Sequence, residues 1–329
     1  MNSMPQPAAS GSPWLEALVT QKEPAAEGIV RFELRPIDHG TLPSFSAGSH
    51  IDVRLPNGAV RQYSLCNDPQ EHNRYEIGIL LDPAGRGGSR SAHEDLRQGD
   101  TLQISPPRNH FPLHTARRSL LLAGGIGVTP MLSMAEQLSR DGADFRFHYC
   151  ARSVVRMAYR QRIQASAYAD RTSFHFDDGS ADQRFDARQV IGDPDQDCHL
   201  YVCGPSGFMD HVIATARELG WAETNIHFEY FAAPQTVPQE SGSFEVKLAT
   251  SGKVVKVAAD KTIAQALADA GVSVPMSCEQ GICGTCLVGV IEGEPDHRDF
   301  YLSDEDKAAN KQITLCCSRA HSPCLVLDL

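Results

Sequence analysis

The sequence has no run of eighteen apolar residues, and this absence argues against a transmembrane helix. Basic residues are also few, because 30 Lys and Arg stand against 41 Asp and Glu, which gives a formal net charge of −11. A nucleic-acid-binding protein would carry a basic patch, so this class is not expected. The acidic excess suits a solubilising surface and leaves open an acidic docking face for a basic partner.

The first residues, MNSMPQPAASGSP, have neither a basic start nor an apolar stretch, so we expect no secretory signal. The 10 cysteines of the chain are therefore expected in a reducing, cytoplasmic setting, as thiols or metal ligands rather than as disulfides. A length of 329 residues predicts two or three domains. We expect residues 1–13 to be a disordered lead-in.

Residues 14–112 are predicted to be rich in β-strands. GIVRFELRP alternates as a half-buried strand does, and Asn57-Gly58 is a strong hairpin signal between two further strands. RYEIGILL and DTLQISPP are additional strands, and one short helix is expected near Ser91–Leu96. Many short strands with one helix predict a small antiparallel Greek-key barrel.

Residues 113–231 alternate between strands and helices. SLLLAGGIG, FRFHYCAR, TSFHFDDG, CHLYVCGP and NIHFEYF are the expected strands, and the expected helices span 129–140, 156–169 and 207–220. The first two strands are nearly continuous apolar runs, which is typical of strands covered on both faces. This segment is therefore predicted to be a doubly wound α/β domain.

Residues 232–242 contain Pro, Gln, Ser and Gly and are predicted to be a linker. Residues 243–329 form a third predicted unit. It opens with a hairpin around Ser251-Gly252, which is followed by the short helix TIAQALADAG and then by a cysteine-rich loop.

In that loop, Cys278, Cys283 and Cys286 lie within nine residues, and Cys316 follows far downstream. Structural zinc sites usually pair two C-x2-C knuckles, and only Cys283 and Cys286 form one here. Three clustered thiolates and one distant thiolate fit the spacing of a plant-type [2Fe–2S] cluster. Small residues in the loop would direct backbone N–H groups at the sulfurs. The spacing alone leaves open whether Cys316 or Cys317 is the fourth ligand.

A candidate flavin site lies in the first segment. Arg61-Gln62-Tyr63-Ser64 ends a predicted strand and offers a cation for a phosphate, an aromatic surface, and a hydroxyl for the flavin N5. The segment GRGGS then leads into the short helix, where backbone amides favour an anion. An ordinary strand and a surface turn are the alternatives for these two motifs taken singly.

A candidate dinucleotide site lies in the second segment. AGGIGVTPM differs from the G-x-G-x-x-G fingerprint but still reads as a strand, a glycine turn and a helix, with Thr129 as N-cap and Pro130 at the first helical position. YVCGPSGFMD repeats this pattern at another strand end, and strand ends are where open α/β sheets bind ligands. The alternatives are a tight turn in the first motif and a buried structural thiol at Cys203 in the second.

The motifs RQYS, GRGGS, AGGIGVTPM, CGPSGFM and CEQGICGTC with LCCSRA, in this order, resemble those of the phthalate dioxygenase reductase family, which includes vanillate demethylase reductases. The resemblance extends from about Trp14 to Leu329. It implies an FMN-binding barrel, an NADH-binding domain and a C-terminal ferredoxin domain of the β-grasp type. Family members carry C-V-S-R-A around the last cluster ligand, so the resemblance selects Cys316 and makes Cys317 a departure from the family pattern.

Site residues follow from the motifs and the resemblance together. Phe231 matches an aromatic residue stacked over the flavin where nicotinamide must enter, and Glu229 lies beside it. The residues assigned to the flavin are Arg61, Gln62, Tyr63, Ser64, Gly87, Gly88, Ser89 and Phe231. Those assigned to the nucleotide are Gly124, Gly125, Gly127, Thr129, Pro130, Arg152, Cys203, Gly204 and Pro205. Those assigned to catalysis are Ser64, Cys203, Glu229 and Phe231, and the cluster ligands are Cys278, Cys283, Cys286 and Cys316.

The implied function is electron transfer from NADH through FMN and [2Fe–2S] to a terminal Rieske-type oxygenase. NADH supplies two electrons at once and the cluster accepts one at a time, so a flavin must stand between them. We expect a monomer that is not itself the oxygenase, because no pair of C-x-H and C-x2-H knuckles is present. Arg152, Ser153 and Arg156 leave NADPH open as the donor. The alternatives are a general NAD(P)H flavoreductase with FAD and another acceptor, and a non-catalytic iron–sulfur redox sensor.

Overall fold

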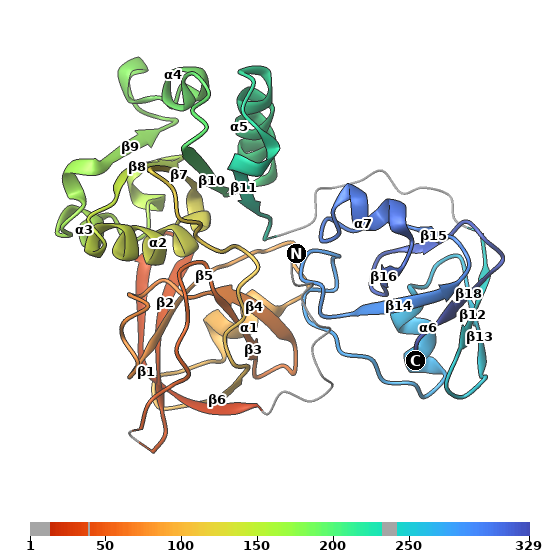
Figure 1. The fold of residues 1–329 in the computed structure, drawn as a ribbon. Helices are drawn as coiled ribbons and strands as arrows, with labels where there is room; N and C mark the ends of the chain where they lie inside the picture. The colour runs from red at the N-terminus through yellow and green to blue at the C-terminus, as the bar shows by residue number, and fades with distance from the viewer. Residues whose placement is uncertain (1–13, 39, 232–241) are drawn as a thin grey trace. The chain divides into compact units, whose positions relative to one another are not determined.

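The computed structural model describes residues 14–38, 40–231 and 242–329 (Figure 1). These residues form two compact units, 14–231 and 242–329, which are treated separately below. The predicted lead-in, 1–13, and residues 232–241 of the predicted linker lie outside the described residues. In the described part of the chain, none of the helices combines the length and the apolar composition that crossing a bilayer requires.

The first six strands form one antiparallel sheet in the order β4-β3-β6-β1-β2-β5. They are β1 (Leu15–Ala26), β2 (Ile29–Pro36), β3 (His50–Arg54), β4 (Val60–Ser64), β5 (Tyr75–Leu80) and β6 (Thr101–Ile104). A bridge between Leu65 and Ile77 joins the end of β4 to β5 and closes the sheet into the predicted barrel. The hairpin predicted at Asn57-Gly58 is confirmed, because β3 and β4 pair on either side of it.

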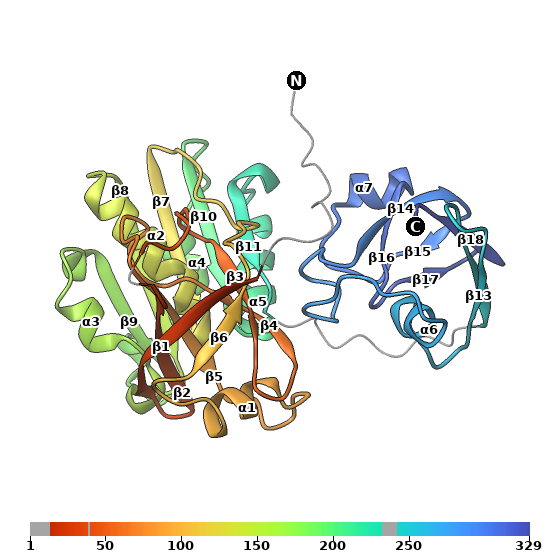
Figure 2. The same ribbon diagram turned by 90° about the horizontal axis from the view of Figure 1, so that it is seen from below.

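The short helix of the barrel begins earlier than predicted. The helix α1 spans Gly88–Glu94 and lies beside β5 at one end of the barrel (Figure 2), whereas the sequence placed it near Ser91–Leu96. Gly87, with φ of 83°, takes the N-cap position in a left-handed conformation, which costs glycine little. The glycine turn therefore starts the helix upstream of the serine.

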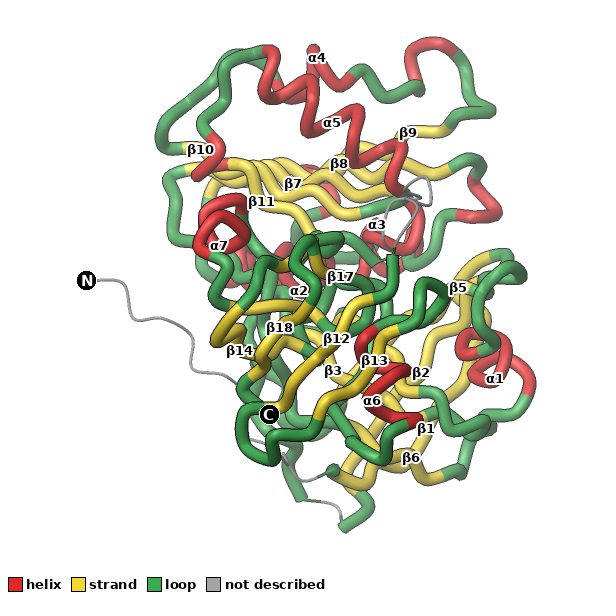
Figure 3. The backbone as a smooth tube through the Cα atoms, turned by 90° about the vertical axis from the view of Figure 1, so that its right-hand side faces the viewer, coloured by secondary structure: helices red, strands yellow, loops and turns green. Residues whose placement is uncertain are grey.

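The next five strands form a parallel sheet in the order β11-β10-β7-β8-β9, which confirms the predicted doubly wound fold. In Figure 3 the helices α2 and α3 lie on one face of this sheet and α4 and α5 on the other. The strands are β7 (Arg118–Gly124), β8 (Asp144–Ala151), β9 (Thr172–Phe176), β10 (Cys198–Cys203) and β11 (Ile226–Glu229). The helices are α2 (Val128–Arg140), α3 (Arg160–Gln164), α4 (Ala187–Ile191) and α5 (Ser206–Glu218).

Short 3₁₀ turns connect these elements. They are η1 (Gly125–Gly127), η2 (Val154–Arg156), η3 (Ala169–Arg171), η4 (Ala181–Gln183) and η5 (Glu223–Asn225). The prediction of Thr129 as N-cap is wrong, because η1 runs directly into α2 and Gly127 takes the cap position. The helix predicted over 156–169 is also too long. It begins after Tyr159 and ends where the Ser166 hydroxyl donates to the Ile163 carbonyl oxygen at 2.7 Å.

The barrel and the α/β part share one hydrophobic core. Ile29, Ala47, Cys66 and Phe111 come from the segment before the parallel sheet, and they pack in the same cluster as residues of α2, β7 and β8. Residues 14–231 therefore fold as one packed unit, in which the shared core holds the barrel and the parallel sheet together.

The second unit has a mixed sheet in the order β13-β12-β18-β14-β16. The helix α6 packs on this sheet through Ile263 and Leu267, and the hairpin predicted at Ser251-Gly252 is confirmed by the pairing of β12 with β13. The strands are β12 (Phe244–Leu248), β13 (Val254–Val257), β14 (Leu287–Glu292), β15 (Pro295–Asp296), β16 (Gln312–Thr314), β17 (Arg319–Ala320) and β18 (Cys324–Leu327). The helices are α6 (Ile263–Asp269) and α7 (Asp304–Ala309).

Candidate functional site

The fold brings the two predicted flavin motifs together. A Cβ atom added to Gly88 would lie 3.0 Å from Cγ and from Nε of Arg61, so the arginine packs directly against the start of α1. Asn57 of the hairpin donates to the Gly87 carbonyl oxygen at 3.2 Å, and the Ser89 hydroxyl accepts the Asp82 N–H at 3.0 Å. A guanidinium group and a glycine turn thus meet at one place, which is a suitable arrangement for a phosphate.

Several buried polar atoms on and near β4 lack a hydrogen-bond partner in the part of the chain that the structure describes, which indicates that a ligand binds along this strand. The Nε2 atom of Gln62, both ring nitrogens of His50 and Oε2 of Glu229 are buried without a hydrogen-bond partner among the described residues. Buried polar atoms are nearly always bonded in native proteins, so each of these atoms requires a partner. A flavin, whose ring carries both donors and acceptors along its edge, fits this set.

The two predicted nucleotide motifs also meet. A Cβ atom added to Gly127 would lie 2.2 Å from the carbonyl oxygen of Cys203, and one added to Gly204 would lie 3.0 Å from Cα of Gly124. The loop after β7 and the loop after β10 therefore contact each other through their backbones, and only glycine permits this approach. Gly125 and Pro205 lie in the same two loops, and Thr129 and Pro130 lie in the first turn of α2, all near the carboxyl ends of parallel strands. This is where open α/β sheets bind nucleotides.

Ser64, Cys203 and Glu229 form the junction between the two sites. Cys203 and Glu229 are register partners on β10 and β11, and the Glu229 carboxyl group interacts with the Ser64 side chain at the end of β4. The Nδ1 atom of His50 lies 4.0 Å from Oε1 of Glu229. The end of the candidate flavin strand and the end of the candidate nucleotide strand therefore converge on one carboxyl group.

Burial controls the protonation of this junction. Burial raises the pKa of the Glu229 carboxyl group to about 8, although the Ser64 side chain acts to lower it. Burial lowers the pKa of His50 to about 3, with smaller contributions from His110 and Arg108. Near neutral pH both groups are therefore uncharged, and the Glu229 carboxyl group brings no negative charge to the junction.

Phe231 and Arg152 lie at the edges of the site. Phe231 lies two residues beyond the end of β11 and is 37% exposed, which leaves part of its ring accessible at the end of the unit. Arg152 is exposed after β8, and its carbonyl oxygen accepts the N–H of Asp178 at 3.2 Å. The neighbouring Arg156 donates to Oε1 of Glu27 at 2.6 Å, so its charge is paired within the chain.

In the second unit, the fold gathers the predicted cluster ligands. The thiol group of Cys278 interacts with those of Cys283 and Cys316, and the thiol group of Cys286 interacts with that of Cys316. Each of the four cysteines is less than one-tenth exposed. Gly281, with φ of 73°, turns the loop so that its N–H donates to Sγ of Cys316 at 3.2 Å.

Further N–H groups point at the sulfurs. Gln280 donates to Sγ of Cys278 at 3.4 Å, and Thr285 donates to Sγ of Cys283 at 3.5 Å. Such donors stabilise the charge of a thiolate-bound cluster. Four converging thiol groups with N–H donors and little solvent exposure fit an iron–sulfur cluster.

The two adjacent cysteines have different surroundings. The thiol group of Cys317 makes hydrogen-bonding contacts with the hydroxyl groups of Thr314 at 3.3 Å and of Ser318 at 3.8 Å. It also lies where a Cβ atom on Gly281 would be, at 2.4 Å. The thiol group of Cys316 interacts with those of Cys278 and Cys286. The thiol group of Cys317 interacts with that of Cys316 and packs against the loop backbone at Gly281.

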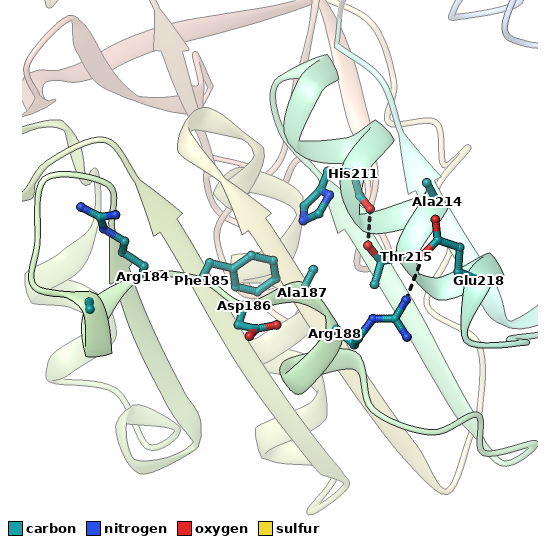
Figure 4. Close-up of a pocket in the computed structure, with 10 residues that line it drawn as sticks. Arg184, Phe185, Asp186, Ala187, Arg188, His211, Ala214, Thr215 and Glu218 are labelled. Carbon is teal, nitrogen blue, oxygen red and sulfur yellow. Dashed lines mark hydrogen bonds and ion pairs between the residues drawn. The ribbon is translucent and has the colours of Figure 1, made fainter.

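A separate pocket of about 530 Å³ lies between α4 and α5 (Figure 4). None of the residues predicted for the sites lines it. Among its charged groups, Arg188 donates to Glu218 at 3.0 Å and Asp186 accepts the Gln189 N–H at 3.0 Å.

His50 is the residue that the sequence did not indicate. It lies on β3, 3% exposed, as the register partner of Ser64. The period-two pattern of HIDVR gave no functional signal, because a single histidine in a strand is usually a core residue. His50 and Glu229 are 179 positions apart in the sequence, so no local sequence pattern indicates that they lie close together.

Two family models match the chain. A model described as 2Fe-2S iron-sulfur cluster binding domain matches residues 246–321, and one described as Oxidoreductase NAD-binding domain matches residues 121–213. The first range includes all four candidate ligands, and the second includes both nucleotide loops.

The chain is also similar to whole proteins. It is 51% identical over 316 residues to the vanillate O-demethylase oxidoreductase of Pseudomonas sp. (strain HR199 / DSM 7063), which covers 96% of this chain and 100% of that protein. It is 42% identical over 320 residues to the phthalate dioxygenase reductase of Burkholderia cepacia, covering 96% and 98% of the two chains. A solved structure of a phthalate dioxygenase reductase, described as modular for electron transfer from pyridine nucleotides to [2Fe-2S], matches with a TM-score of 0.75 and 42% identity over 96% of this chain and 98% of that one. The chain belongs to the phthalate dioxygenase reductase family.

Proposed function

We propose that this chain is the reductase component of a Rieske-type oxygenase system and passes electrons from NADH through FMN and a [2Fe–2S] cluster to the oxygenase. The observation that carries the proposal is the junction of Ser64, Cys203 and Glu229 within one packed unit. It places the end of the flavin strand against the end of the nucleotide strand, as hydride transfer between two bound cofactors requires.

Separate groups of residues bind the two cofactors of the first unit. Arg61, Gly88 and Ser89 hold the phosphate end of FMN, while Gln62, Tyr63 and Ser64 line its ring. Gly124, Gly127 and Gly204 allow the two nucleotide loops to pack together, and Gly125, with nothing in the described chain within 4 Å of its Cβ position, leaves room for the nucleotide beside the backbone. When bound, FMN supplies the conversion between a two-electron donor and a one-electron acceptor.

Glu229 keeps this junction electrically neutral. Because it is protonated near neutral pH, it opposes neither the approach of a hydride nor the negative charge that follows it. Ser64 orients a hydroxyl group toward the same position. Phe231 would lie against the flavin face when FMN is bound, at the position where nicotinamide must enter.

In the second unit, Cys278, Cys283, Cys286 and Cys316 are the proposed cluster ligands. The N–H groups of Gln280, Gly281 and Thr285 stabilise the sulfur charge. Relatives named as reductases of vanillate demethylase and of phthalate dioxygenase support an oxygenase as the acceptor. We further propose a monomer in the cytoplasm.

The test is NADH-dependent reduction of cytochrome c by the purified protein loaded with FMN and cluster. We expect turnover with NADH, and a loaded but inactive wild-type protein would contradict the proposal and favour a redox sensor. Cys283→Ser should abolish one-electron output while NADH still reduces the flavin. Loss of both steps in that variant would contradict the proposed order of cofactors. Chromatography of the flavin released by acid distinguishes FMN from the FAD of a general flavoreductase.

A further inference from the structure

A partly buried ionic cluster, centred on the buried carboxylate of Glu76, joins the barrel to the α/β part. Glu76 on β5 is 2% exposed and accepts hydrogen bonds from Arg31 at 3.0 Å, from Arg74 at 3.0 Å and from Arg162 at 2.8 Å. Arg31 and Arg74 belong to the barrel, whereas Arg162 lies on α3 of the α/β part. Arg162 also donates to Oε1 of Glu136 on α2 at 3.3 Å. We name these five residues the Glu76 cluster.

We propose that Arg162 is a positioning residue for hydride transfer, because it fixes the α/β part on the barrel in the orientation that brings nicotinamide to the flavin. The inference rests on the proposed function. It concerns a residue that contacts neither of the candidate cofactor motifs and that acts through Glu76.

The location of the cluster supports this role. The thiol group of Cys66, two residues beyond Ser64, lies 3.4 Å from Oε1 of Glu76. Two residues further along β5, a Cβ atom on Gly78 would lie 3.1 Å from Cγ2 of Thr129. One strand thus touches the segment that follows β4 through Glu76, and the start of the nucleotide-loop helix through Gly78.

The hydrogen bonds of the Glu76 cluster are directional, so they define the orientation of the α/β part on the barrel in a way that apolar packing does not. The shared core of the two parts holds them together, but hydrophobic burial is non-directional, so it defines their relative orientation less sharply than directional bonds do. A guanidinium group that bonds two carboxylates through its planar fork fixes both distance and angle. Burial acts to raise the pKa of Glu76, yet the charges of Arg162, Arg31 and Arg74 hold it below its ordinary value. The carboxylate therefore stays ionised and keeps its arginines in place.

The backbone next to Arg162 also indicates a constrained contact. Tyr159 has a φ of 59°, a conformation that few residues other than glycine adopt. Its hydroxyl group lies 3.5 Å from Sγ of Cys66 in the barrel. A rare backbone conformation persists where the surrounding contacts determine it, and these contacts join the two parts of the unit.

The experiment compares Arg162→Met, Arg162→Lys and the control Arg188→Met in the full chain loaded with FMN and cluster. Arg188 forms an exposed ion pair with Glu218 in the same α/β part, at 3.0 Å. The measurements are the saturating rate of flavin reduction by NADH under anaerobic conditions, the charge-transfer absorbance between nicotinamide and flavin, and the affinity for ADP-ribose. ADP-ribose lacks nicotinamide, so it reports on the nucleotide loops alone.

We expect Arg162→Met to lower the saturating rate roughly 10- to 100-fold, as small misplacements of reacting groups do. The charge-transfer band should be lost, while ADP-ribose affinity stays within about twofold of wild type. Arg162→Lys should lose less, because an ammonium group can pair with a carboxylate but cannot form the fork. Arg188→Met should match wild type.

A folded Arg162→Met protein with the wild-type rate and charge-transfer band would overturn the inference. If this variant does not fold, Arg162→Lys provides the test. A wild-type rate of flavin reduction in Arg162→Lys would overturn the inference. A lower rate with unchanged ADP-ribose affinity would support it. A readout on the cofactor-free chain is amide hydrogen exchange, which should be faster in α3 and β5 of the variant; unchanged exchange there would also count against it. Failure of the wild-type protein to be reduced by NADH would reject the proposed function instead.

Discussion

Glu229 ends β11 beside Ser64, Cys203 and His50, and burial raises the pKa of its carboxyl group to about 8. In the unfolded chain the same group titrates at its ordinary value of 4.5. Between these two values the folded protein holds a proton that the unfolded chain has released. The free energy of unfolding therefore falls as pH rises from about 4.5 to about 8.

Glu229→Gln should remove this dependence. The slope for wild type is about 1.4 kcal/mol per pH unit from this one group, so the free energy of unfolding of the 14–231 unit should drop by a few kcal/mol between about pH 5 and about pH 8. The measurement is urea unfolding of the cofactor-free chain at several pH values. Glu218→Gln, at an exposed carboxylate, is the control and should keep the wild-type slope. Equal slopes in Glu229→Gln and wild type would show that Glu229 is ionised in the folded state.

Cys316 and Cys317 allow a matched pair of substitutions. Cys316→Ser should lower bound iron roughly tenfold or more, because it removes a proposed ligand that the Gly281 N–H orients. Cys317→Val should keep the cluster, because the thiol group of Cys317 interacts with that of Cys316 but its other hydrogen-bonding contacts are with the hydroxyl groups of Thr314 and Ser318. Iron and sulfide analysis with visible absorbance measures both outcomes. Retention of the cluster in Cys316→Ser would assign the fourth position to another side chain.

Secondary-structure elements whose apolar residues recur at a regular spacing could be predicted from the sequence. Elements without such a regular spacing could not. The strands GIVRFELRP and RYEIGILL alternate and appear as β2 and β5. The longest strand, β1 (Leu15–Ala26), gave no such signal because its second half is polar, contains Pro24 and has irregular register. The short helix α4 was also missed, although Asp186 caps it. Helix starts shifted where glycine turns, rather than serine or threonine, began the helix.

The same limit applies to the candidate site. The motifs at β4, β7 and β10 were visible because each combines a strand end with glycine or hydroxyl residues. The contacts of Glu229 with Ser64 and His50 join three strands that are distant in sequence. Long-range contacts of this kind leave no local pattern, so only the folded chain shows them.

The glycine contact between the loops after β7 and β10 predicts a large local effect. Gly127→Ala would place a methyl group 2.2 Å from the carbonyl oxygen of Cys203, so the two backbones must separate. We expect a loss of about 1–3 kcal/mol in the free energy of unfolding, together with weaker binding of ADP-ribose. Thermal unfolding and titration calorimetry measure the two effects.

Gly207→Ala is the matched control at the start of α5. A Cβ atom there meets nothing within 4 Å, so the substitution should be neutral or stabilise the helix by up to about 1 kcal/mol. An equal loss in both variants would mean that the close approach of the loops does not limit stability.

For the whole molecule, the division of the cores is the main feature. The residues of 14–231 fill three hydrophobic clusters, one of which the barrel and the α/β part share, while residues of 242–329 fill a fourth cluster of their own. The proposed iron–sulfur ligands belong entirely to the second unit. Each unit therefore has the packed interior that separate folding requires.

Removing the iron should then affect one unit only. Calorimetry of the full loaded chain is expected to show two transitions, and chelation of iron should lower the Tm of one by several degrees while the other stays within about 1 °C. Urea-gradient fluorescence provides a second measurement, because Trp14 and Trp221 both belong to the first unit. A single transition that shifts as a whole would show that the two units unfold together.

The neutral Glu229 also affects the thermodynamics of binding. A nucleotide that changes the surroundings of a carboxyl group with a pKa of about 8 also changes its average protonation, so near that pH each binding event takes up or releases part of a proton. The buffer supplies or absorbs this proton. The heat of nucleotide binding should therefore vary with the ionisation enthalpy of the buffer, and the slope of that variation counts the protons that accompany each NADH molecule.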